Sequence, residues 1–136
     1  MRELRAHAPK TILVVEDNPD IQRLLQRGLP SSYRIVAAFD GESAIAHAER
    51  EHPDLILLDL YLPNGDGYSV LRRLAAVPEL ARIPVAVISA AGYGHAAQSR
   101  DAGAAAFIEK PLDLRRLAET VEQLLEGSDR PVVAAS

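Results

Sequence analysis

The sequence has no cysteine, and its apolar runs are all short. Without cysteine the chain cannot form a disulfide, a thiolate metal site or a cysteine nucleophile. A membrane-spanning helix requires roughly 18 consecutive apolar residues, and no run approaches that length. The N-terminal stretch MRELRAHAPK is charged and has no apolar segment behind it, which does not fit a signal peptide. We therefore expect a cytoplasmic protein with no membrane partner.

The sequence also lacks clustered positive charge. Its formal net charge is -4 over 136 residues, whereas nucleic-acid binding depends on clustered lysine and arginine that displace counterions. The basic doublets Arg72-Arg73 and Arg115-Arg116 lie in helical patterns that also contain acids. The histidines form no cluster with the spacing of a zinc site. We expect one domain with no direct nucleic-acid partner.

What the sequence does contain is a regular alternation of apolar strands and amphipathic helices. Thr11 to Val15 is a continuous aliphatic and β-branched run, typical of a strand buried on both faces. Asn18-Pro19 then predicts the start of a helix with an apolar stripe formed by Ile21, Leu24 and Leu25. The alternation predicts further strands at 34–39, 55–58, 83–89 and 104–108. It predicts helices after Asp40, over 68–76 behind a loop at 64–67, and after Asp113.

Five strands that alternate with helical segments predict an α/β fold. Strands joined by helices run parallel, and right-handed crossovers cover both faces of the sheet, so we predict a doubly wound three-layer sandwich with five flanking helices. The segment AGYGHAAQSRDAG fits least well, because Gly92 and Gly94 lie near its start and it has no large aliphatic stripe. We expect a short or mobile fourth helix there. The domain is expected at 10–126, between flexible tails at 1–9 and 127–136, the second of which could begin a linker.

Polar side chains stand at the predicted carboxyl ends of four strands. Glu16 and Asp17 follow the first strand, Asp59 the third, Ser89 ends the fourth and Lys110 follows the fifth. Each alone has a structural explanation as a helix cap, a turn residue or a surface charge. Ligands of open parallel sheets bind beyond the carboxyl ends of the strands, so we expect these residues to lie together.

This combination of residues indicates phosphoryl chemistry. Carboxylates on one rim repel one another, and a cation is needed to keep them ionised. Mg²⁺ prefers oxygen ligands and is commonly held by one or two carboxylates. With a cation bound, Asp59 can act as a nucleophile toward phosphorus. Lys110 then supplies a charge and Ser89 a hydroxyl donor for the phosphoryl oxygens.

Taken together, these stretches resemble the receiver domains of two-component response regulators. The match covers about Lys10 to Glu126: an acidic pair after the first strand, an aspartate followed by LYLPNGDG after the third, a hydroxyl after the fourth, and Lys-Pro after the fifth. The resemblance implies a flavodoxin-like sheet in the order 2-1-3-4-5. It also implies a phosphorylation-activated switch of a two-component system or phosphorelay, which is no enzyme beyond its own phosphoryl transfer and slow dephosphorylation. Because no DNA-binding or catalytic domain follows Glu126 in the sequence, we expect a stand-alone receiver without an output domain.

The resemblance assigns an acceptor and a metal site. Asp59 would accept a phosphoryl group from a phosphohistidine of a sensor histidine kinase or a histidine phosphotransfer protein. Mg²⁺ would be held by Asp17, Asp59 and the backbone carbonyl of Tyr61, with Glu16 acting through a metal-bound water.

The resemblance also assigns the response to phosphorylation. Ser89 and Lys110 would contact the phosphoryl group, Ser89 and Phe107 would form the switch, and the Lys110-Pro111 bond would be cis. A downstream protein effector would bind the face formed by the fourth helix, the fifth strand and the last helix. The bulky Tyr61 and the apolar Ala91 predict restricted water access and slow self-dephosphorylation.

Three other functions are compatible with parts of the pattern. A phosphorylation-independent adaptor of the same fold is the main alternative, although it would not need all five site residues. A phosphohydrolase would need a general acid two residues after Asp59, where Tyr61 stands. A flavin-binding protein would need a phosphate-binding loop after Val15, and the acidic residues there would repel phosphate.

Overall fold

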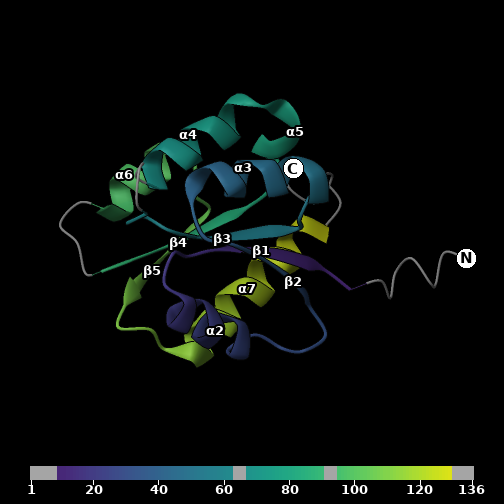
Figure 1. The fold of residues 1–136 in the computed structure, drawn as a ribbon, viewed down its shortest axis with the longest axis vertical. Coiled ribbons are helices and arrows are strands. Elements are labelled where there is room, and N and C mark those ends of the chain that lie inside the picture. The colour runs from purple at the N-terminus through teal and green to yellow at the C-terminus, as the bar shows by residue number, and fades with distance from the viewer. Residues whose placement is uncertain (1–8, 63–66, 91–94, 130–136) are drawn as a thin grey trace, which may run out of the picture.

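The protein is a three-layer α/β sandwich in a computed structural model that describes residues 9–62, 67–90 and 95–129. Its central sheet is parallel throughout, in the strand order β2-β1-β3-β4-β5. The strands are β1 Thr11–Val15, β2 Arg34–Ala38, β3 Leu55–Asp59, β4 Val85–Ala90 and β5 Ala106–Lys110. The helices are α2 Pro19–Arg27, α3 Gly41–Glu51, α4 Gly67–Ala76, α5 Pro78–Ala81, α6 His95–Asp101 and α7 Leu114–Asp129. Figure 1 shows α2 and α7 on one face of the sheet and the other helices on the opposite face.

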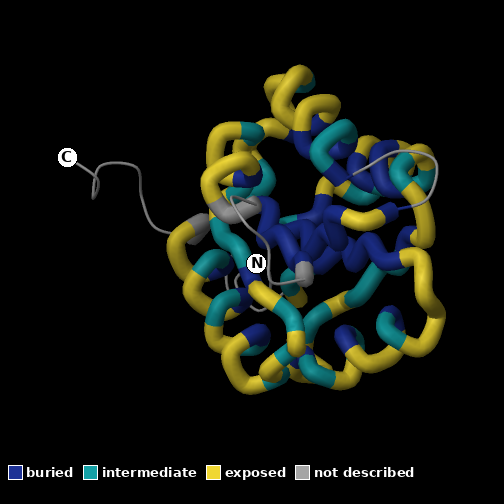
Figure 2. The backbone as a smooth tube through the Cα atoms, turned by 90° about the vertical axis from the view of Figure 1, so that its left-hand side faces the viewer, coloured by how far each residue is buried: buried dark blue, intermediate teal, exposed yellow. Residues whose placement is uncertain are grey.

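The strands alternate their side chains between two cores. In β1, Ile12 and Val14 enter the core under α2 and α7, whereas Leu13 and Val15 enter the core under α3 and α4. All of β3 is buried, and the centre of the molecule is buried throughout in Figure 2. This two-sided burial explains why the central strands are continuous apolar runs.

Polar caps start three helices where the sequence predicts them. Asn18 Oδ1 accepts hydrogen bonds from the backbone N–H groups of Asp20 and Ile21 at 2.8 and 3.2 Å. Asp40 caps α3 in the same way, and Asp113 caps α7. These caps satisfy N–H groups that have no partner inside the helix. No helix within the described ranges is both long enough and apolar enough to cross a membrane.

The buried face of α2 differs from the prediction. Leu24, expected in the apolar stripe, is 43% exposed, while Gln22 and Leu25 are buried. The periodicity of a helix alone does not determine which of two neighbouring residues is buried. The position of α2 over the ends of β1 and β2 brings Gln22 inward, where its amide finds backbone partners.

Several predicted boundaries also shift. The described residues include a sixth helix, α5, which the prediction of five helices missed, because four residues are too few to show periodicity. β5 lies at Ala106–Lys110 instead of 104–108, because alanine is a weak strand former and the register with β4 extends to Lys110.

The last helix is longer than predicted. α7 continues through Gly127 to Asp129, anchored by buried Val121 and Leu125, so the predicted tail at 127 starts too early. Residues 1–8 and 130–136 of the predicted tails lie outside the described residues.

The short helix α6 carries an unusual buried hydroxyl. The helix has seven residues, as expected of a short fourth segment, although Gly92 and Gly94 lie outside the described residues. Ser99 is fully buried, and its Oγ has no hydrogen-bond partner within the described part of the chain. A buried polar group without a partner destabilises the folded state by roughly 1–3 kcal/mol.

Replacing Ser99 with alanine should therefore raise the free energy of unfolding by about 1 kcal/mol, since alanine also has the higher helix propensity. Urea denaturation of the purified protein measures this. Ser43→Ala is the control, because the Ser43 Oγ donates to the Asp40 carbonyl at 3.2 Å and should give no gain. A loss of stability in Ser99→Ala would show that the hydroxyl has a stabilising partner.

Candidate acidic functional site

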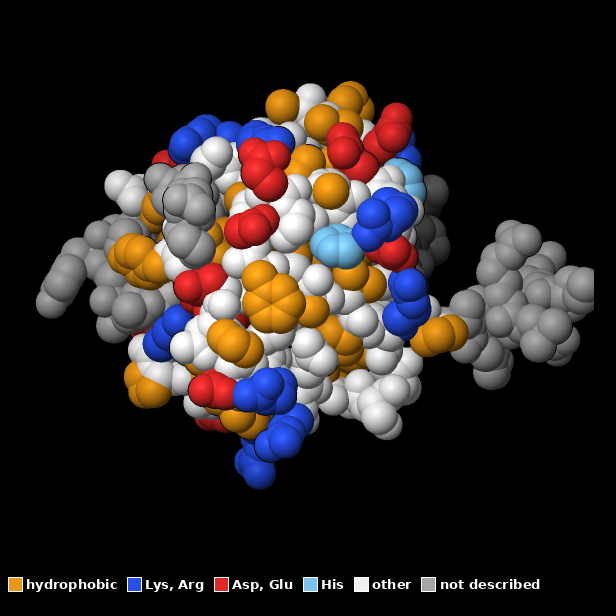
Figure 3. Space-filling view, in the orientation of Figure 1, with side chains coloured by type: hydrophobic (Ala, Val, Ile, Leu, Met, Phe, Trp, Pro, Cys, Tyr) orange, Lys and Arg blue, Asp and Glu red, His pale blue; other side chains and the backbone are white. Residues whose placement is uncertain are grey.

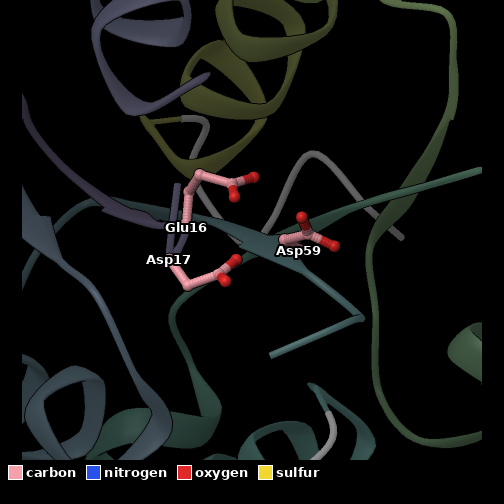
Figure 4. Close-up of side chains that lie close together, drawn as sticks. All are labelled: Glu16, Asp17 and Asp59. Carbon is pink, nitrogen blue, oxygen red and sulfur yellow. The ribbon is translucent and has the colours of Figure 1, made fainter. Parts of the chain in front are cut away.

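Three carboxylates meet at the carboxyl edge of the sheet. Glu16 and Asp17 follow β1, and Asp59 is the last residue of the adjacent β3. One carboxylate oxygen from each lies within 4.8 Å of the others, and Figure 4 shows the side chains of Glu16 and Asp17 extending toward the side on which Asp59 lies. Glu16 and Asp59 are 1% and 4% exposed, whereas Asp17 is exposed. The predicted grouping of these acids is confirmed.

Backbone contacts of the described residues after β3 hold Asp59 and the start of α4 in place. Asp59 Oδ1 accepts a hydrogen bond from the N–H of Tyr61 at 2.9 Å. The Gly67 N–H donates to the Leu60 carbonyl at 2.7 Å, closing the loop. A Cβ at Gly67 would lie 2.6 Å from the Leu60 Cα, so only glycine allows this approach. The last glycine of the LYLPNGDG stretch, Gly67, is therefore required for steric reasons.

Lys110 brings one positive charge to the acids. Its Nζ lies 3.2 Å from Asp59 Oδ2, as expected if the ends of β3 and β5 contribute to one site. The Lys110-Pro111 peptide is cis, which confirms the prediction. Asp59 thus contacts a backbone donor through one oxygen and an ammonium through the other.

The local charge does not balance. Glu16, Asp17 and Asp59 carry three potential negative charges, and Lys110 supplies one positive charge. Burial raises the pKa of Glu16 to about 8, with a further contribution from the neighbouring Asp59 carboxyl, while the Asn18 N–H donating to Glu16 opposes the rise. Buried Glu16 Oε1 has no partner among the described residues.

This donor set fits a hard divalent cation. Two oxygen ligands of one Mg²⁺ lie at most about 4.2 Å apart, given metal–oxygen distances of about 2.1 Å. The carboxylate oxygens, within 4.8 Å of one another, are close to that spacing. A cation here would also give Glu16 Oε1 a counter-charge and would favour the ionised form of the carboxyl.

The two predicted switch residues lie on neighbouring strands. β4 and β5 pair Val87 with Phe107 and Ser89 with Glu109. Because side chains alternate along a strand and Val87 faces the α3/α4 core, Ser89 points to the same side as partly buried Phe107. Ser89 is fully buried, and its Oγ lacks a hydrogen-bond partner within the described ranges. The hydroxyl is thus available to a new acceptor near Asp59.

The sequence pattern does not reveal two residues that shape the site. It places Gly67 only in a loop, and it does not mark Gln22 as a site residue. The position of Gln22, three residues before the buried Leu25, is the signal that could indicate a buried glutamine. Ala91, which the sequence suggests limits water access, lies outside the described residues.

Comparison with known proteins identifies the family. The model of the response regulator receiver domain matches residues 12–122. The chain is 42% identical over 104 residues to the response regulator PleD of Caulobacter vibrioides, a match covering 75% of this chain and 23% of PleD. It is 36% identical over 119 residues to the polar-differentiation response regulator DivK of Brucella ovis, covering 85% and 96% of the two chains.

Solved structures agree with this assignment. A CheY-like receiver domain from Methanospirillum hungatei superposes with a TM-score of 0.80 at 27% identity, covering 89% of this chain and 97% of that one. The phosphorylated cyanobacterial phytochrome response regulator RcpA gives a TM-score of 0.73 at 36% identity, with coverages of 88% and 93%.

The fold and the acidic edge define a receiver-type signalling domain. The chain belongs to the response regulator receiver domain family, as its sequence resemblance predicted. Domains of this family take part in phosphorylation signalling. The chain spans about a quarter of PleD and about half, 52%, of the transcriptional regulator RpaA of Synechocystis.

Proposed function

We propose that this domain accepts a phosphoryl group on Asp59 from a phosphohistidine, in a Mg²⁺-dependent reaction, and signals through the resulting change of state. The observation that carries the proposal is the environment of Asp59. It is a buried carboxylate 3.2 Å from the Lys110 ammonium, and it shares a 4.8 Å cluster with two other acids. A buried aspartate needs no such cluster for a purely structural role.

The reaction requires little of the protein besides position and charge. An Asp59 carboxylate oxygen forms the new P–O bond while the P–N bond of the donor breaks, and the donor imidazole takes up a proton. Lys110 and Ser89 would stabilise the charge on the phosphoryl oxygens, which fits a transfer that depends on electrostatics. The acyl phosphate remains bound, so the domain modifies itself and is not an enzyme for separate substrates.

Asp17, Asp59 and the backbone carbonyl of Tyr61 are the ligands that we assign to Mg²⁺, with Glu16 acting through water. A bound metal would supply positive charge that offsets the negative charge of the reacting oxygens. The Tyr61 N–H contact with Asp59 supports this choice, because it places the Tyr61 backbone at the site.

The donor is a sensor histidine kinase or a histidine phosphotransfer protein, as is general for receiver domains. We propose that it docks on α2, which begins two residues after Asp17 and on which Leu24 is 43% exposed. Because kinases draw phosphoryl groups from ATP, we place the reaction in the cytoplasm. Acidic and basic side chains are mixed over the face in Figure 3, in keeping with a protein partner instead of a nucleic acid.

We propose that the signal passes to a separate protein through the face formed by α6, β5 and α7. Phe107 on β5 lines a small hollow with Ser99 and Arg100 of α6, and it lies two residues before Glu109, the register partner of Ser89. A shift of Ser89 toward a phosphoryl group can therefore reach this face through β5. The short α6 supports the same route, because a seven-residue helix has few buried contacts to hold it.

Phosphotransfer tests the function directly. Purified, phosphorylated kinases and phosphotransfer proteins from the source organism are mixed with the domain in Mg²⁺ or in excess EDTA. We expect at least one donor to lose its label to the domain in Mg²⁺ and to retain it in EDTA. Failure of every donor, and of acetyl phosphate, to label the folded protein would contradict the proposal.

The phosphoryl group should be lost slowly. Tyr61 is 57% exposed two residues after Asp59, where its ring can limit the approach of water. Decay of the purified phosphoprotein, followed on phosphate-affinity gels, should be slower than decay of the Tyr61→Gly variant, and Tyr68→Phe on α4 serves as the control. A half-life of only seconds in the unaltered protein would show that water reaches the acyl phosphate freely.

A further inference from the structure

A buried glutamine lies directly behind the acidic site. Gln22 on α2 is 2% exposed and points toward the ends of β1 and β2. Its Nε2 lies 3.2 Å from the carbonyl oxygen of Val14 and 3.3 Å from those of Glu16 and Ala38. Its Oε1 accepts a hydrogen bond from Gln26 Nε2 at 3.0 Å. The side chain therefore uses both ends of its amide group.

The three carbonyls mark the place where the chain leaves the sheet. The Glu16 N–H donates to the Ala38 carbonyl at 3.0 Å, immediately beyond the paired residues of β1 and β2. Beyond this bond the Glu16 carbonyl has no strand partner, and Gln22 supplies its donor. A buried carbonyl must find such a donor or destabilise the local structure.

The same contacts hold Asp17 from both sides. The carbonyl of Glu16 belongs to the peptide that leads into Asp17, and Gln22 donates to it. The residue after Asp17 is Asn18, whose N–H donates to Glu16 Oε2 at 3.0 Å and whose side chain caps α2. The exposed carboxylate of Asp17 is thus carried by a short backbone segment fixed at both ends.

We propose that Gln22 is a positioning residue for the metal site. By tying the Glu16 carbonyl to α2 and to the ends of both strands, it directs the acids of β1 toward Asp59. The inference rests on the proposed function, since it concerns the same Mg²⁺ site. Gln22 contacts neither Asp59 nor the phosphoryl position, so its effect passes entirely through the Glu16-Asp17 backbone.

The test is metal binding by Gln22→Met, which keeps the length of the side chain and removes the donor. Isothermal titration with Mg²⁺, and electron paramagnetic resonance with Mn²⁺ as the probe, should both show affinity lowered by about tenfold or more, the usual effect of losing an outer partner of metal ligands. Gln26→Met is the matched control on the next helical turn. It should change the affinity by less than about twofold, because Gln26 bonds only to Gln22 Oε1 among these groups.

The rate of phosphorylation by acetyl phosphate distinguishes an effect of Gln22 on Mg²⁺ binding from an effect on the phosphoryl transfer itself. In Gln22→Met, the Mg²⁺ concentration for half-maximal rate should rise about tenfold, while the rate at saturating Mg²⁺ stays within about twofold of the unaltered protein. An unchanged Mg²⁺ affinity would overturn the inference and leave the function standing. Absence of Mg²⁺ binding and labelling in the unaltered protein would instead overturn the proposed function.

A second measurement needs no variant and covers the case in which Gln22→Met does not fold. In the unaltered protein, the side-chain amide protons of Gln22 should exchange slowly with solvent. They should also show scalar couplings across hydrogen bonds to the carbonyl carbons of Val14, Glu16 or Ala38. Fast exchange without such couplings would overturn the inference.

Discussion

Replacing Asp59 with asparagine is expected to abolish phosphorylation of the domain. Asparagine has nearly the same shape, and its amide oxygen can still accept the Tyr61 N–H bond that Asp59 accepts at 2.9 Å. The amide is not a nucleophile toward phosphorus, so no acyl phosphate can form. The substitution also removes one negative charge from a crowded cluster, and the fold should survive. Label transferred from a phosphorylated donor should fall to background.

Asp54→Asn is the matched control for this experiment. Asp54 immediately precedes β3 at its opposite end, where its Oδ2 accepts the Thr11 N–H at 2.8 Å. The same chemical change there should leave phosphorylation intact. Labelling of Asp59→Asn at an undiminished rate would place the acceptor elsewhere.

The Asp59→Asn variant also distinguishes a phosphorylation-dependent switch from a phosphorylation-independent adaptor. In cells, a chain that signals through its acyl phosphate should lose its output when Asp59 becomes asparagine. An adaptor that uses only the fold should keep it, since the surface residues are unchanged. Normal signalling by Asp59→Asn, with normal protein level, would favour the adaptor.

The second large expected effect is a strong pH dependence of Mg²⁺ binding. The pKa of Glu16 is raised to about 8, mainly by burial, so the metal-free protein holds a proton there at neutral pH. Cation binding favours the ionised carboxyl and must displace that proton. The apparent Mg²⁺ affinity should therefore rise with pH by up to about tenfold per unit from about pH 6, and level off above about pH 8.

Isothermal titration in buffers of different ionisation enthalpy measures both the affinity and the proton released. Glu16→Gln carries no titrating carboxyl at this position and should flatten the pH dependence. An affinity that is equal at about pH 6 and about pH 8 in the unaltered protein would contradict the linkage.

The free energy of unfolding of the metal-free protein should also depend on the ionisation of Glu16, but it should fall as pH rises. The folded protein retains a proton on Glu16 up to a pKa of about 8, whereas the unfolded chain releases it near the ordinary glutamate pKa of 4.5. The folded state then binds more protons between these values, so metal-free stability should fall as pH rises through this window. Added Mg²⁺ should reverse the loss at the alkaline end, because it binds only the folded site.

The site was largely predictable because topology decides where strand ends meet. Once the strands are known to be parallel, the residues after β1 and at the ends of β3 and β5 must share one edge of the sheet. The grouping of Glu16, Asp17, Asp59 and Lys110 needed no side-chain detail. The helix caps Asn18 and Asp40 were predictable for a similar reason, since a local bond determines each of them.

Other features depended on tertiary packing that local patterns do not encode. Helical periodicity placed Leu24 inward, yet α2 is oriented so that Gln22 can donate to the strand ends. The extent of α7 past Gly127 follows from the docking of Val121 and Leu125, which outweighs a helix penalty of about 1 kcal/mol for glycine. The four-residue α5 is too short to leave a periodic signal.

Locating the phosphoryl group is the most direct test of the account. The protein is labelled by a phosphorylated donor in Mg²⁺, reduced with borohydride to convert an acyl phosphate to a stable alcohol, and digested for mass spectrometry. The account predicts homoserine at position 59 and at no other aspartate, with none formed when EDTA is present during labelling. Modification of Asp17 or of a serine, or the same yield at Asp59 in EDTA, would contradict it.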